Sequence, residues 1–110
     1  MMNNTVKELF ELIDKKQGED IKIIDFKNNS PFLDYFLICG ARNSRLANAI
    51  IGEVEDYAVA HNIDVISKDV NKDGVWLLID IGSIVVHVFV GDERNKYNLE
   101  GLWKDLIIEL

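Results

Sequence analysis

Residues 75–103, VWLLIDIGSIVVHVFVGDERNKYNLEGLW, decide the fold of this 110-residue chain. Two apolar runs flank Gly82-Ser83, a dipeptide typical of the tight turn that joins antiparallel strands. A two-residue loop makes Ile81 oppose Ile84 and sets the register of the whole hairpin. The predicted cross-strand pairs are Asp80 with Val85, Leu78 with His87, and Trp76 with Phe89.

This register assigns every hairpin side chain to one of two faces, because side chains alternate along a strand. One face carries only aliphatic residues: Val75, Leu77, Ile79, Ile81, Ile84, Val86, Val88 and Val90. The other face mixes an acid, a histidine, a tryptophan and a phenylalanine. We expect helices to cover the aliphatic face and the mixed face to stay partly open for contact with another molecule.

The chain before the hairpin predicts two helices. A capping-box pattern starts the first at Thr5, and Gly18 is suited to end it in a left-handed conformation. Asn43 or Ser44 can cap the second, a long amphipathic helix that ends near residues 61–62. Its expected buried stripe is Leu46, Ile50, Val54, Tyr57 and Ala58.

The remaining elements are strands and one C-terminal helix. Strands are expected at 21–26, 34–40 and 65–67, with a turn at 27–31 that Pro31 favours. Asn98 can cap the last helix. The apolar face of that helix would hold Leu99, Leu102, Trp103, Leu106, Ile107 and Leu110.

This order of elements predicts an α/β (α+β) fold with a mixed sheet of four to five strands and helices mainly on one face. We expect one domain, residues 1–110, which can fold without a metal or a disulfide. The lone Cys39 lies in an apolar run and should be a small core residue. With no secretory leader and no membrane-spanning run predicted, we expect a cytoplasmic protein.

The charge of the chain restricts its partners. Twelve basic and 19 acidic residues give a net charge of -7 at pH 7. Direct binding to nucleic acid normally needs a basic patch, so we do not expect it. A basic protein is the more suitable partner, because opposite charges speed encounter and exclude wrong partners.

Two enzymatic interpretations compete with a binding role. The loop 40–45 joins a strand to a helix and holds two arginines, as an anion site would, but it lacks the glycine density of a phosphate cradle. Asp80 and His87 can form a hydrogen-bonded pair on the mixed face, although no third catalytic group accompanies them. For both features a structural role is the favoured interpretation, with no cofactor and no metal.

The candidate partner-binding residues therefore lie on the mixed face and in the bend that follows it. Burying an acid beside aromatic rings without a partner costs about 1 to 3 kcal/mol, which favours exposure of this face. Trp103 is assigned first to the core. The candidate residues are Trp76, Leu78, Asp80, His87, Phe89, Arg94, Lys96 and Tyr97.

Several short motifs, in order and spacing, resemble the Iojap family of ribosome-silencing factors across nearly the whole chain. They are Asp34-Tyr35-Phe36, Asn43-Ser44-Arg45, Trp76 with Asp80-Ile81-Gly82, Val86-His87-Val88-Phe89, and residues 97–103, YNLEGLW. The chain departs from the family at Ser83, where an acid is usual, and at Asn43, where serine is frequent.

The resemblance implies a fold related to nucleotidyltransferases without their activity, consistent with Leu78 standing where a second metal-binding carboxylate would be needed. It also implies a translational repressor, not an enzyme, that binds the large ribosomal subunit through its universal ribosomal protein fourteen. Such binding would block joining of the small subunit or assist large-subunit biogenesis. A residual nucleotide-binding enzyme and a homodimer that hides the mixed face remain alternatives.

Overall fold

The hairpin has the predicted register in the computed structural model, which describes residues 4–26, 33–70 and 74–108. β4 (Trp76–Asp80) and β5 (Ile84–Val90) run antiparallel, with Trp76 opposite Phe89 and Leu78 opposite His87. The Ile81 N–H donates to the Ile84 carbonyl at 3.0 Å and closes the two-residue turn. Gly82 has a φ of 95°, a conformation that glycine adopts without steric cost.

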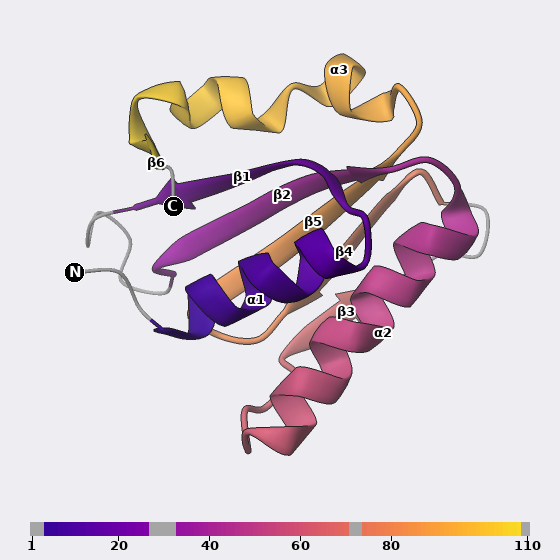
Figure 1. Cartoon of the computed structure of the whole chain (residues 1–110). Helices are drawn as coiled ribbons and strands as arrows, with labels where there is room; N and C mark the ends of the chain where they lie inside the picture. The colour runs from indigo at the N-terminus through magenta and orange to yellow at the C-terminus, as the bar shows by residue number, and fades with distance from the viewer. Residues whose placement is uncertain (1–3, 27–32, 71–73, 109–110) are drawn as a thin grey trace.

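In the described ranges, six strands form one mixed sheet in the order β3-β4-β5-β2-β1-β6 (Figure 1). The β2 and β5 strands pair parallel, and every other pair is antiparallel. The expectation of four to five strands is therefore wrong by one or two. The other strands are β1 (Glu19–Asp25), β2 (Tyr35–Ala41), β3 (Ser67–Asp69) and β6 (Ile107–Ile108).

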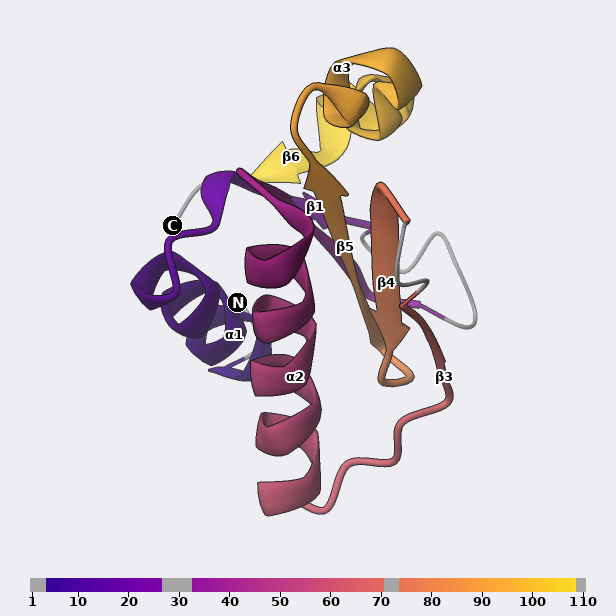
Figure 2. The ribbon, with the colours of Figure 1, turned by 90° about the vertical axis from the view of Figure 1, so that its right-hand side faces the viewer.

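Two helices cover the aliphatic face of the sheet, α1 (Asn4–Lys15) and α2 (Ser44–Ala60) (Figure 2). Their buried side chains and the inward side chains of the strands form the main core. The predicted core role of Cys39 is confirmed, and burial raises the pKa of its thiol to about 12. No helix in the described ranges is long and apolar enough to cross a membrane.

The ends of α1 and α2 lie close to the predicted positions, with small differences at α1. Asn43 is the cap of α2, and its side-chain oxygen accepts from the Leu46 N–H at 2.8 Å. Thr5, predicted to cap α1, lies within the helix, which already includes Asn4. At its end Gln17, with a φ of 68°, adopts the left-handed conformation that we predicted for Gly18. Gly18 is needed for another reason, since a Cβ there would lie 2.5 Å from Ile13 Cγ2.

The prediction of one continuous C-terminal helix is wrong. The chain forms a short α3 (Glu93–Tyr97) and then a 3₁₀ helix, η1 (Leu99–Leu106), which is kinked at Trp103. Ile107–Ile108 then leave the helix and pair with β1. Residues 27–31, predicted as a turn, lie outside the described residues, as does Leu110.

The α3–η1 segment lies on the side of the sheet opposite α1 and α2 (Figure 2). It helps to enclose a second, smaller core made of Ile24, Phe26, Ile38 and Phe89. Trp103 packs edge-on against Phe26 and Phe36, with ring centroids 5.3 and 5.4 Å apart. The α3–η1 segment therefore covers part of the mixed face, and this face is less open than the sequence indicated.

Candidate partner-binding surface

Trp76 lies at the border between the second core and solvent. Its indole is partly buried, and its ring centroid lies 4.9 Å from that of Phe89 and 4.7 Å from that of Tyr97. The indole Nε1–H donates to His87 Nδ1 at 3.1 Å. An aromatic ring with part of its surface exposed and its polar atom satisfied within the protein is suited to serve as a contact anchor.

His87 is buried, with 5% of its surface exposed, so the expectation that it lies on the open surface is wrong. The ring of Phe36 packs against it with centroids 4.5 Å apart. Burial lowers the pKa of His87 to about 4, which keeps the imidazole neutral near pH 7. The residue supports the surface from beneath.

The predicted hydrogen bond between Asp80 and His87 is not formed. The Asp80 carboxylate accepts from the Gly82 N–H at 2.8 Å, and this bond stabilises the hairpin turn. His87 Nδ1 accepts from Trp76 instead. The predicted role of Asp80 in the turn is therefore confirmed, whereas His87, predicted to be half-buried, is buried. Asp80 and Leu78 stay partly exposed.

Phe89 is fully buried, and the expectation that it lies open is wrong. Its ring faces the α3–η1 side of the sheet, where Tyr97 lies 5.9 Å away between ring centroids. The sequence register placed Phe89 on the correct face of β5, but it could not show that a distant segment returns to cover that face. Phe89 is a buried member of the second core.

Arg94 is also buried rather than exposed. Its guanidinium donates twice to the Glu100 carboxylate, at 2.8 Å each, and once to the Glu19 carbonyl at 3.1 Å. Burial alone would lower the pKa of Arg94, but the bonds and charge of Glu100 raise it, so the side chain stays charged. Arg94 therefore fastens α3 and η1 to β1.

Lys96 and Tyr97 meet the expectation of exposure. The Lys96 ammonium is exposed and lies 3.1 Å from a Glu93 carboxylate oxygen. Half of the Tyr97 surface is accessible, while its ring contacts Trp76. The exposed part of the candidate surface therefore comprises Trp76, Leu78 and Asp80 of β4, and Lys96 and Tyr97 of α3.

Three residues near this surface were missed in the sequence. Phe36 supports His87, Glu100 neutralises Arg94, and Leu102, expected in a buried stripe, is 71% exposed. The alternation in β2 carried a signal for Phe36, because it faces opposite to Leu37 and opposes Val85 in the sheet. Nothing local indicated the pairing of Arg94 with Glu100.

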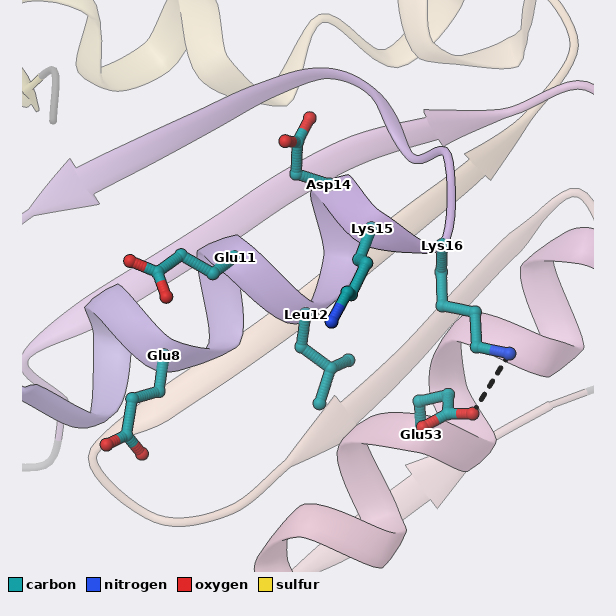
Figure 3. Close-up of a pocket in the computed structure, with 7 residues that line it drawn as sticks. All are labelled: Glu8, Glu11, Leu12, Asp14, Lys15, Lys16 and Glu53. Carbon is teal, nitrogen blue, oxygen red and sulfur yellow. Dashed lines mark ion pairs between the residues drawn. The ribbon is translucent and has the colours of Figure 1, made fainter.

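A polar groove lies on the other side of the molecule, between α1 and α2 (Figure 3). Several of its charges have partners: Lys16 contacts Glu53 at 3.1 Å, and Glu8 accepts a hydrogen bond from Tyr57. Burial first, and then Glu8, raises the pKa of Tyr57. These contacts hold the two helices together.

The strand-to-helix loop has a local structural role. Asn43 caps α2, and Arg42 donates to the Gln17 side chain at 3.3 Å. Among the described residues, no group of three or more His, Cys, Asp and Glu side chains gathers where it could hold a metal ion.

Together the fold and the surface define a mixed α/β protein. Its candidate site is an exposed aromatic and polar surface on the mixed face of the sheet. Residues 1–109 match the model of a family described as "Ribosomal silencing factor during starvation", and the chain belongs to that family. The predicted resemblance to the ribosome-silencing factors is confirmed.

The relatives agree with this assignment. The chain is 42% identical over 92 residues to the ribosomal silencing factor RsfS of Bacillus subtilis, covering 84% of this chain and 78% of the relative. A crystal structure of a Bacillus halodurans protein is 35% identical, with a TM-score of 0.83 over 98% of this chain and 100% of that one. A mouse protein named "Mitochondrial assembly of ribosomal large subunit protein 1" is 31% identical over 98 residues, covering 86% of this chain and 43% of the mouse protein.

Proposed function

We propose that this protein binds the large ribosomal subunit through universal ribosomal protein fourteen and thereby blocks joining of the small subunit. The observation that carries the proposal is the partly exposed Trp76, held by two rings and a hydrogen bond at the open border of the sheet. The mouse relative, named for assembly of the large subunit, supports the same target. A role in large-subunit biogenesis would use the same contact.

Charge and size are compatible with this role. The net charge of -7 suits a basic ribosomal protein and disfavours direct contact with ribosomal RNA. The molecule extends 34 × 32 × 23 Å. A body of that size at the joining face would obstruct the other subunit by its volume alone, so no catalytic step is required. The proposal includes a cytoplasmic location and a single folded domain.

The test is co-sedimentation with purified large subunits through a sucrose gradient. Trp76→Ala should weaken binding by about thirtyfold, equivalent to about 2 kcal/mol, because a central aromatic anchor is lost. The fold should also lose some stability, because the ring packs on Phe89 and Tyr97 and its N–H bonds to His87, so binding is compared well below the unfolding transition.

Val86→Ala is the matched control on the opposite face of the hairpin. Val86 is fully buried under the helices, so its truncation should cost about 1 to 3 kcal/mol of folding stability and leave binding intact below the unfolding transition. The docking surface is wrongly assigned if Trp76→Ala lowers stability alone and Val86→Ala lowers binding alone.

Kinship with nucleotidyltransferases is part of the proposal, and retained nucleotide binding is its alternative. Asp80 is engaged in the turn, and Leu78 stands two residues before it, where a second carboxylate would be required. Titration calorimetry with ATP or CTP and magnesium should give no binding heat. A saturable heat that disappears in Asp80→Asn would favour the enzyme.

A further inference from the structure

Three groups restrain the Trp76 indole. Phe89 and Tyr97 contact the ring, and His87 Nδ1 accepts its N–H at 3.1 Å. The two aromatic contacts limit where the ring lies, while the hydrogen bond fixes which edge of the indole points inward. His87 is therefore the group that sets the orientation of the indole.

The bond to Trp76 also defines the protonation of His87. A ring nitrogen that accepts a hydrogen bond carries no proton, so the proton of the neutral imidazole is on Nε2. Nε2 is buried and has no hydrogen-bond partner in the part of the chain that the structure describes. An unpaired buried N–H normally costs stability, and its retention needs a compensating role.

Surrounding groups hold the imidazole in place. His87 lies in β5, in the middle of the sheet, where it pairs in register with Ile38 of β2 and Leu78 of β4. Phe36 packs on its ring at 4.5 Å between centroids. His87 has 5% of its surface exposed, and the partly exposed Trp76 lies between it and solvent on this side.

We infer that His87 is a positioning residue: it holds the indole of Trp76 in a single docking orientation by accepting its N–H. This inference rests on the proposed function and adds to it the source of the anchor's rigidity. A side chain that is already ordered loses less conformational entropy when it binds, so its contacts yield more affinity.

The test compares two substitutions at one site in the full-length protein. His87→Leu removes the acceptor and keeps an apolar side chain of similar size. His87→Asn places an amide oxygen where Nδ1 stands, so it should restore the bond. Ile38→Val, in the same small core, controls for a general loss of packing.

The first readout is the indole N–H signal of Trp76 in ¹H–¹⁵N NMR spectra of the free protein. It is distinguished from Trp103 by its loss in Trp76→Ala. In His87→Leu the signal should move upfield and its exchange with water should accelerate at least about tenfold, as expected for a lost hydrogen bond. His87→Asn and Ile38→Val should stay close to the wild type.

The second readout is affinity for purified large subunits. It should fall roughly three- to tenfold in His87→Leu, the effect of freeing one side chain, and stay within about twofold in the other two variants. An unchanged indole signal in His87→Leu, or an Asn variant that behaves like Leu in both readouts, would overturn the inference. Normal binding by Trp76→Ala would instead overturn the docking surface, and the indole signals would still decide whether His87 orients the ring.

Discussion

At the scale of single residues, His87 and Arg94 were expected to contact a partner, but both support the candidate surface from inside the protein. His87 accepts the indole N–H of Trp76, and Arg94 joins α3, Glu100 and the backbone of β1. Both are buried. Substitutions at these positions should therefore affect binding indirectly, through the order of the residues above them.

Acid should destabilise the protein through His87. Burial lowers its pKa from 6.5 to about 4, so the folded state favours the neutral ring. The full stability is present above pH 6.5 and falls as the pH drops toward 4, by about 3 kcal/mol for a shift of this size. Urea unfolding across this pH range should show a weaker pH dependence for His87→Leu than for the wild type. Parallel losses in both proteins would contradict the assignment.

At the scale of elements, the ion pair between Arg94 and Glu100 helps to hold the C-terminal segment in place. Arg94 and Glu100 side chains are only 10% and 18% exposed, and their two bonds bridge α3 and η1. The register of β1 against β2 shifts between Glu19 and Lys22, and the Glu19 carbonyl accepts a hydrogen bond from the same guanidinium. The segment that covers the second core is thus held by charge as well as by apolar contact.

Removing one member of this pair should be costly. Arg94→Leu leaves the Glu100 carboxylate without its buried partner and should lower unfolding free energy by about 2 to 4 kcal/mol. The double change with Glu100→Leu should cost less than the sum of the two single changes, which thermal or urea unfolding can measure. Lys96→Ala is the control, because its exposed ion pair with Glu93 contributes about 1 kcal/mol at most. Additive losses in the double variant would rule out the coupling.

The hairpin and α2 could be predicted because their signals are local. Alternation, the turn at Gly82 and the cap at Asn43 each depend on a few neighbouring residues, and the structure has all three. The last helix could not be predicted correctly. Its apolar residues are spaced by three at Leu99 and Leu102, and again at Trp103 and Leu106, which suits a 3₁₀ helix as well as an α-helix.

The site was predicted in part for a related reason. The register placed Trp76, His87 and Phe89 on the correct face, but their burial depends on contacts with other elements. Phe36 of β2 packs on His87, and Tyr97, which follows β5, packs on Phe89. The strand β6 depends on a long-range pairing of Ile107–Ile108 with the edge of β1. Contacts between distant segments leave little trace in local periodicity, so these features required the structure.

At the scale of the whole molecule, the exposed surface around Trp76 offers a route to self-association. Tyr97 and Leu102, on the adjoining C-terminal segment, expose 50% and 71% of their surfaces. We expect two copies to pair weakly through this surface, since an exposed apolar patch favours association. Sedimentation at several concentrations should show a dimer that Trp76→Ala weakens and that added ribosomal protein fourteen dissociates. A dimer that persists in the presence of that protein would place self-association on another surface.

The outermost strands, β3 and β6, have only three and two residues in the described part of the chain. Edge strands this short offer another polypeptide chain few free backbone N–H and C=O groups with which to extend the sheet. Recognition is consequently left to side-chain chemistry, so a few point changes can redirect the choice of partner while the architecture stays intact.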